Sequence, residues 1–144
     1  MNVPLVTSRD SWFRPKVDAT IVGRIGENLA AYYLEFNDFE CSIVDRRGAD
    51  IWCRAPSGTL FGLEVKTSSN LVQKRKYHSF YITKKEADQF MLTCLNTNLI
   101  RVFSREKLID RMNMNKSDII HMKPEEFTEE LMLDDISRLK SYYS

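Results

Sequence analysis

The chain has 144 residues, with 21 Lys and Arg against 20 Asp and Glu, which gives a formal net charge of +1. This near-neutral balance excludes the strong overall basic character of many nucleic-acid binders, so any attraction to phosphate has to come from local clusters. No apolar run approaches the roughly 20 residues of a membrane span, and residues 1–14 lack the apolar run of a secretory signal. We therefore expect a cytoplasmic protein with no membrane partner.

The length predicts one compact domain over residues 1–144 with a sizeable core. Residues 1–19 show no regular pattern and are predicted to be an N-terminal arm. An amphipathic helix is predicted over residues 20–36, because apolar side chains recur there at three- and four-residue steps. This apolar stripe consists of Ile21, Ile25, Leu29, Tyr32 and Phe36.

Three short β-type runs follow this helix and are expected to form a meander. They cover residues 40–45, 49–54 and 59–67, and a Pro-Ser-Gly turn at 56–58 joins the second run to the third.

The rest of the chain alternates between predicted helices and strands. Thr83 and Glu86 have the spacing of a capping box, so a helix is predicted over residues 83–95. The remaining predicted elements are strands at 78–82, 99–103 and 118–122, a helix at 104–112, and a helical region from Pro124 onward. This order predicts an α/β fold with a mixed sheet flanked by helices. Its core would be residues 20–103, and residues 104–144 would form a C-terminal α/β extension.

The segment from Asp50 to Lys66 carries the pattern that points to chemistry. Side chains alternate along a strand, so Glu64 and Lys66 share one face, with Cα atoms about 6.6 Å apart. Asp50 opens the preceding strand, which should run antiparallel to the third one and can bring its carboxylate to the same pocket.

Two converging carboxylates suit a hard cation such as Mg²⁺, which prefers oxygen ligands. A lysine on the same face can hold an attacking hydroxide or stabilise negative charge that builds on a phosphate. The alternative is a solvent-facing strand whose Glu-x-Lys has no chemical role, because alternating charges are common on such surfaces. The predicted placement of Asp50 beside Glu64 favours the chemical interpretation.

Three segments together resemble the PD-(D/E)XK nuclease superfamily, in particular its small single-domain endonucleases and archaeal Holliday-junction resolvases. These segments are Gly23-Arg24-Ile25-Gly26-Glu27, Gly48-Ala49-Asp50 and Glu64-Val65-Lys66. The resemblance implies a restriction-endonuclease-like α-β-β-β-α-β core and cleavage of DNA, including branched or junction DNA, in repair or recombination. The sequence departs from the family in having Ala49 where a proline precedes the aspartate, and in being less basic than the resolvases.

The resemblance also implies roles for individual residues. Asp50 and Glu64 would bind Mg²⁺, with Mn²⁺ as a substitute, and the Val65 backbone carbonyl would be a further ligand. Lys66 would act on the attacking water. Glu27 would be an acidic catalytic residue from the first helix.

The position of Glu27 leaves two alternatives. On a helical wheel it lies nearly opposite Ile25 and Leu29, among Gly23, Ala30 and Ala31. Either this small-residue face packs closely on the sheet and carries Glu27 into the site, or Glu27 is solvated.

Several polar residues are candidates for contact with nucleic acid, although basic runs usually mark a solvated surface. Thr67 and Ser68 are either phosphate donors or capping groups at a strand end. The basic candidates are Arg46, Arg47, Lys74, Arg75, Lys76 and Lys84. The acids between Glu125 and Asp135 are predicted to form a solvated helix face.

These patterns together predict a metal-dependent endonuclease that acts on DNA. Cutting both strands of a duplex calls for two sites, which favours a homodimer, although no residue identifies its interface. The alternative is a non-catalytic nucleic-acid-binding or interaction protein on a nuclease fold.

Overall fold

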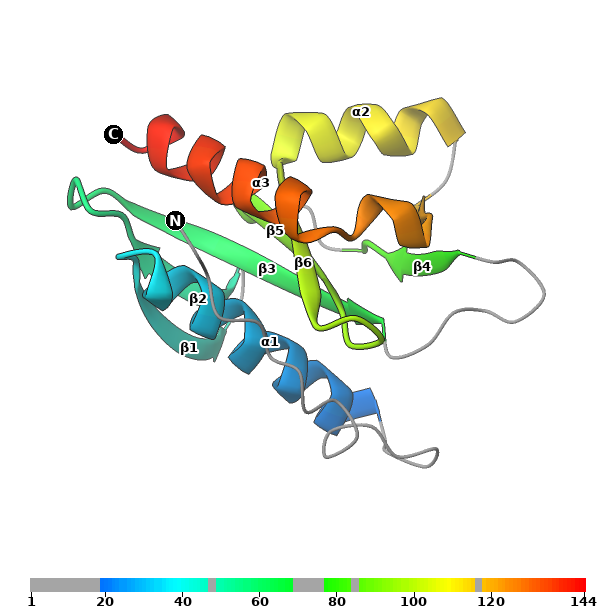
Figure 1. Ribbon diagram of the computed structural model, residues 1–144, viewed down its shortest axis with the longest axis horizontal. Coiled ribbons are helices and arrows are strands. Elements are labelled where there is room, and N and C mark those ends of the chain that lie inside the picture. Colours follow the sequence, from blue (N-terminus) through cyan, green and yellow to red (C-terminus); the bar gives the residue numbers. More distant parts are fainter. Residues whose placement is uncertain (1–18, 47–48, 69–76, 84–85, 116–117) are drawn as a thin grey trace.

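The computed structural model describes residues 19–46, 49–68, 77–83, 86–115 and 118–144 (Figure 1). Side chains are not described for residues 19, 45, 46 and 115 within these ranges. The elements are α1 (Ala19–Phe36), β1 (Glu40–Arg46), β2 (Ala49–Arg54), β3 (Leu60–Ser68), β4 (His78–Tyr81), β5 (Gln89–Cys94), β6 (Leu99–Ser104), α2 (Arg105–Asn115), β7 (Ile119–Met122), a 3-10 turn (Pro124–Glu126) and α3 (Glu129–Tyr142).

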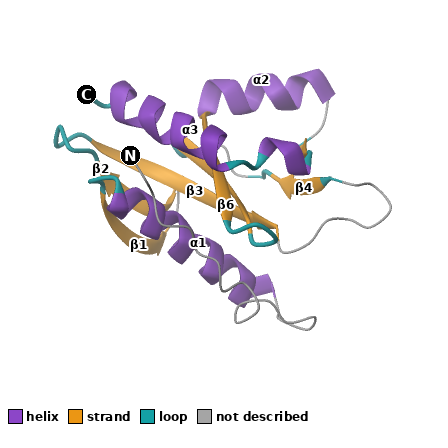
Figure 2. Ribbon diagram, in the orientation of Figure 1, coloured by secondary structure: helices purple, strands orange, loops and turns teal. Residues whose placement is uncertain are grey.

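The strands form a mixed five-stranded sheet in the order β1-β2-β3-β5-β6, and β4 pairs with β7 in a separate ribbon (Figure 2). β1, β2 and β3 are an antiparallel meander, β3 and β5 are parallel, and β5 and β6 are antiparallel. The predicted fold class, an α/β fold with a mixed sheet flanked by helices, is confirmed.

The helix predicted over residues 83–95 is wrong, because Gln89–Cys94 is the strand β5. Every residue of β5 is buried, as expected for a central strand with both faces covered. The capping-box pattern is a local signal, and it cannot show that the apolar run after it pairs with β3 and β6. A strand therefore occupies the position at which the α-β-β-β-α-β order would have its second helix. Residues 84–85 of the predicted helix lie outside the described residues.

Two residues with positive φ fix where α1 and β2 end. Asp38 has a φ of 71° after α1, and the Phe39 N–H donates to the Leu34 carbonyl at 3.1 Å. Gly58 has a φ of 94° in the β2–β3 turn, and its N–H donates to the Ala55 carbonyl at 2.8 Å. Such a φ favours glycine, and the turn sets the register in which β2 meets β3.

The first face of the sheet is covered by α1, which packs on β3 and β5, and by the end of α3, which packs beside β6. Gly26 of α1 lies against Thr67 of β3, and Tyr143, just after α3, stacks on Phe61 with ring centroids 4.1 Å apart. Because alternate side chains share a face, the buried residues Leu63 and Val65 between them point the same way.

The second face of the sheet carries the alternate residues and is only partly covered by described elements. At the end of β3, the buried His78 of β4 contacts Ser68 of β3 and Cys94 of β5. The side chains of Arg111 in α2 and Phe103 in β6 meet in a cation–π contact of 5.9 Å. Over β1 and β2, the residues Ser42, Trp52 and Arg54 of this face are exposed.

The core is one continuous cluster of buried apolar side chains between the sheet and its covering elements. Among the described helices, none has the length and apolar character needed to cross a bilayer.

Candidate active site

The carboxylate of Asp50 lies against the backbone of β3. The regular pairing of β2 with β3 ends at Ile51 and Leu63, and one further step places Asp50 opposite Glu64. Opposite residues of antiparallel strands carry their side chains on the same face. The Oδ2 atom of Asp50 accepts a hydrogen bond from the Val65 N–H at 2.8 Å, which holds this carboxylate next to Glu64.

The Val65 carbonyl points toward the same gap between β2 and β3. In a strand the N–H and C=O of one residue point to the same side, so the Val65 carbonyl faces β2 as its N–H does. Since the regular pairing has ended at this level, the Asp50 side chain takes the place of a ladder partner. The Asp50 carboxylate and the Val65 carbonyl therefore lie together at the point where the pairing of β2 with β3 ends.

Glu64 and Lys66 form an ion pair on the second face. The Lys66 Nζ atom lies 3.4 Å from Oε1 of Glu64. The Glu64 side chain is 9% exposed and that of Lys66 is 30% exposed, so the carboxylate is largely shielded while the ammonium still reaches solvent. The buried Phe90 of β5 lies beside Glu64 in the parallel register. A shielded acid beside a cation is an arrangement that can act on a bound phosphate.

Glu27 lies on a helix face that packs closely on the sheet. A Cβ atom on Gly26 would lie 1.8 Å from Oγ1 of Thr67, and Ala30 and Ala31 are buried. Of the two alternatives, the small-residue face does pack, and Glu27 is half-buried at its border.

This packing does not add Glu27 to the Asp50–Glu64 pair. Within the described ranges, no three Asp, Glu, His or Cys side chains gather closely enough to hold a metal ion. The physical reason is topological, since α1 covers the first face and the Glu64–Lys66 pair lies on the second. Glu27 therefore forms no three-carboxylate cluster with Asp50 and Glu64.

The hydroxyls of Thr67 and Ser68 both have hydrogen-bond partners within the protein. Thr67 is on the first face, where its Oγ1 accepts a hydrogen bond from Thr93 Oγ1 at 2.7 Å. Ser68 is buried, and its Oγ lies 2.8 Å from Nδ1 of His78. The proposed phosphate contacts from these two hydroxyls are not supported, because strand alternation and burial direct both groups into packed regions.

The basic candidates fall largely outside what the structure describes. This applies to the side chain of Arg46 and to Arg47, Lys74, Arg75, Lys76 and Lys84. Their contact with phosphate stays a prediction.

Asp135 was predicted to lie on a solvated helix face, and this is wrong. Its side chain is fully buried, accepts from Arg101 Nε at 2.6 Å and from the Val102 N–H at 2.9 Å, and pairs with Arg138. Asp135 comes from the face of α3 that also buries Met132, Ile136 and Leu139. The helical spacing of these apolar residues was the signal in the sequence.

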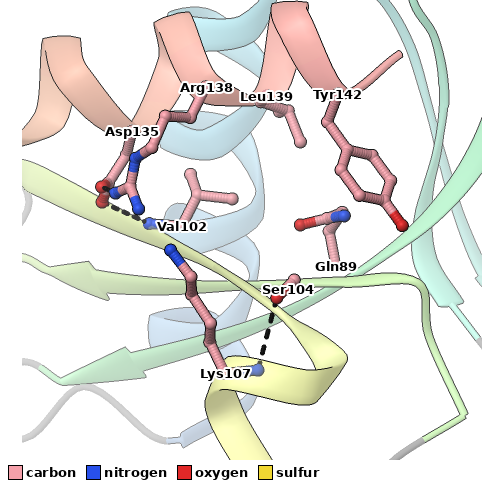
Figure 3. Close-up of a pocket in the computed structure, with 8 residues that line it drawn as sticks. All are labelled: Gln89, Val102, Ser104, Lys107, Asp135, Arg138, Leu139 and Tyr142. Atoms are coloured by element: carbon pink, nitrogen blue, oxygen red, sulfur yellow. Dashed lines mark hydrogen bonds and ion pairs between the residues drawn. The ribbon is translucent and has the colours of Figure 1, made fainter.

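A cavity of about 240 Å³ lies beside Asp135, between α3, β5, β6 and the start of α2 (Figure 3). It opens on the first face and is separate from Asp50 and Glu64. Its lining residues are Gln89, Val102, Ser104, Lys107, Asp135, Arg138, Leu139 and Tyr142.

Sequence comparison finds no protein-family model and no curated protein that matches this chain. Among solved structures, the chain is similar to the bacterial homing endonuclease I-Ssp6803I, with a TM-score of 0.61 and 14% sequence identity. The match covers 86% of this chain and 98% of that one. At this identity the similarity concerns the fold, and we conclude that the chain shares its fold with this homing endonuclease.

Proposed function

We propose that the protein is a metal-dependent endonuclease that hydrolyses phosphodiester bonds in DNA. The observation that carries the proposal is the contact of the Asp50 carboxylate with the Val65 N–H, which sets Asp50 beside the Glu64–Lys66 pair. The fold shared with a homing endonuclease supports the same conclusion.

The oxygen atoms at the end of the β2–β3 pairing are suitable ligands for magnesium. The carboxylates of Asp50 and Glu64 and the Val65 carbonyl are hard donors of the kind that Mg²⁺ or Mn²⁺ prefers. A bound ion would lower the pKa of a coordinated water and neutralise charge on the phosphate. Two carboxylates are enough, because Mg²⁺ usually retains several waters.

Lys66 supplies the positive charge for the reaction. Its ammonium, held beside Glu64, would donate hydrogen bonds to the attacking water and to a phosphoryl oxygen as charge accumulates there. The water oxygen bonds to phosphorus while the bond from phosphorus to the 3′-oxygen breaks. The attacking water gives up a proton to solvent, and the leaving 3′-oxygen takes one up. By resemblance to the PD-(D/E)XK nucleases, the products are a 5′-phosphate and a 3′-hydroxyl.

The finer assignments rest on the sequence resemblance. We propose membership of the PD-(D/E)XK superfamily, action on branched or junction DNA in repair or recombination, and assembly as a homodimer. The motifs Gly48-Ala49-Asp50 and Glu64-Val65-Lys66 support the superfamily and the substrate. The homodimer is supported only by the need for two sites to cut both strands of a duplex.

Cleavage of labelled linear, nicked and branched DNA, with and without Mg²⁺ or Mn²⁺, tests the proposal. We expect Asp50→Asn and Lys66→Ala to lose at least about 10²–10³-fold in cleavage rate, the usual cost of removing one electrostatic contact to the transition state. Asp134→Asn and Lys123→Ala are matched controls, because both residues are exposed. Full activity in either site variant, with an unchanged thermal melt, would overturn the mechanism.

The second candidate function is a protein that binds nucleic acid without cutting it. It predicts binding of the same DNA panel with no metal-dependent product. A binding protein needs no shielded carboxylate pair beside a phosphate, and for this reason we favour the endonuclease.

A further inference from the structure

Trp52 is a large apolar side chain left open beside the candidate active site. It is 45% exposed and lies in β2 between the half-buried Asp50 and the exposed Arg54 on the same face, whereas Ile51 and Cys53 point into the core. Since residues two apart in a strand share a face, Trp52 is on the second face with Asp50, with Cα atoms about 6.6 Å apart.

Trp52 has small neighbours across the sheet. Its register partners are Ser42 of β1 and Gly62 of β3, a short side chain and no side chain. Glu64 lies two residues beyond Gly62, so it is a diagonal neighbour of Trp52, at a separation of about 7–8 Å that aromatic side chains can span. Trp52 is therefore a neighbour in the sheet of both Asp50 and Glu64.

We propose that Trp52 is a base-stacking subsite for an unpaired nucleotide of the DNA substrate, next to the phosphate that is cleaved. This inference rests on the proposed function and adds to it a class of substrate. One nucleotide spans the distance, with its phosphate at Asp50 and Glu64 and its base over the indole. Stacking on an aromatic side chain tolerates any base, because every base has a π-face.

The position of Trp52 indicates which kind of ligand binds there. A partner protein, or a second copy of the chain, that covered Trp52 would also cover Asp50 two residues away and block the phosphate from the site. The nucleic acid itself is the occupant that leaves the carboxylates in use. It must offer an unpaired base, because the faces of paired bases are already occupied by stacking within the duplex.

The experiment measures DNA binding in EDTA, so that no cleavage occurs and the result does not depend on activity. Two DNAs of equal length are compared by fluorescence anisotropy, a continuous duplex and a duplex with a single-stranded arm. We expect Trp52→Ala to weaken binding of the armed DNA about tenfold, equivalent to about 1.4 kcal/mol, with less than about a twofold effect on the duplex. Trp52→Phe, which keeps a stacking ring, should bind within about threefold of the unchanged chain.

Tyr142→Ala is the matched control, because Tyr142 is a 65% exposed aromatic residue on α3, which covers the first face. The chain has two tryptophans, so a Trp12→Phe background isolates the fluorescence of Trp52, which the armed DNA should quench.

Four outcomes would overturn the subsite. They are unchanged binding in Trp52→Ala, an equal loss on both DNAs, an equal loss in Tyr142→Ala, and conversion of a dimer to a monomer with no change in DNA binding. Failure of the unchanged chain to bind the armed DNA in EDTA removes the subsite, and failure to cleave either DNA with Mg²⁺ removes the proposed function. If Trp52→Ala binds the armed DNA normally and still shows metal-dependent cleavage, the subsite is refuted and the proposed function stands.

Discussion

At Gly26, the absence of a side chain sets the distance between α1 and the sheet. A Cβ atom there would lie 1.8 Å from Oγ1 of Thr67 and 2.8 Å from Oγ1 of Thr93. Both threonines belong to central strands, and they are hydrogen-bonded to each other at 2.7 Å. Neither side chain can move away without breaking that contact, so the helix would have to shift.

We expect Gly26→Ala to lower the free energy of unfolding by about 1–3 kcal/mol, the usual cost of overpacking. This loss would appear although alanine is favoured over glycine inside a helix by about 1 kcal/mol. Gly23→Ala in the same helix is the control, because a Cβ there has no atom within 4 Å, and it should gain up to about 1 kcal/mol. Urea denaturation measures both, and equal stability of the two variants would contradict this account of the packing.

The sequence predicts helices, strands and turns well where the signal is local, and less well where packing against other elements determines the structure. The helix α1 and the turn at Gly58 have local patterns, and both lie where they were predicted. The predicted apolar stripe is not the buried face of α1, because Ile21 and Phe36 are exposed and the helix packs on the sheet through Gly26 and its buried neighbours Leu29, Ala30 and Tyr33. The run Phe90-Met91-Leu92 is equally consistent with a buried helix and a buried strand, and its pairing with β3 decides for the strand. The spacing of Met132, Ile136 and Leu139 separates Asp135 from its exposed neighbour Asp134, but only tertiary contacts identify Arg101 as its partner.

Asp135 joins α3 to β6 through a buried charge. Its carboxylate is fully buried and lies between Arg101, whose side chain is 11% exposed, and the backbone of Val102. Burial lowers the pKa of the Arg101 guanidinium, but far from enough to discharge it, so its counter-charge must stay in place. This pair therefore ties α3 to the edge strand.

Replacing Asp135 with alanine should lower the free energy of unfolding by about 3–5 kcal/mol, because Arg101 would keep a buried charge without its main partner. Asp135→Asn should cost less, since an amide oxygen can still accept from the Val102 N–H. The neighbouring Asp134→Ala is exposed and should change stability by less than about 0.5 kcal/mol. Thermal or chemical unfolding that finds Asp135→Ala as stable as Asp134→Ala would refute the role of this pair.

At the scale of the whole molecule, the two faces of the sheet differ, because one packs against helices and the other carries the proposed active site. The first face is covered by α1 and the end of α3, and on the second face Trp52 is exposed two residues from Asp50 in β2. Strand alternation was enough to predict that Glu64 and Lys66 share a face, and a single turn was enough to place Asp50 beside them. The relation of Glu27 to these residues depends on how a helix crosses the sheet, which no local pattern contains.

This arrangement predicts a stability that depends on metal. A ligand that binds only the folded chain stabilises it by RT ln(1 + [L]/Kd), which is about 1.4 kcal/mol at ten times Kd. For a chain of this size, that corresponds to a rise in Tm of about 3–6 °C. We expect such a rise on adding millimolar Mg²⁺, measured by calorimetry, and its loss on adding EDTA.

The Asp50→Asn variant decides whether the rise comes from the proposed site. Asparagine keeps an oxygen that can accept from the Val65 N–H, so the fold should persist, but it removes one of the two anionic ligands. The Mg²⁺-induced rise should therefore disappear in Asp50→Asn and remain in Asp134→Asn, whose carboxylate is exposed on α3. An equal rise in both variants would place the metal elsewhere, and it would favour a protein that holds nucleic acid without cutting it.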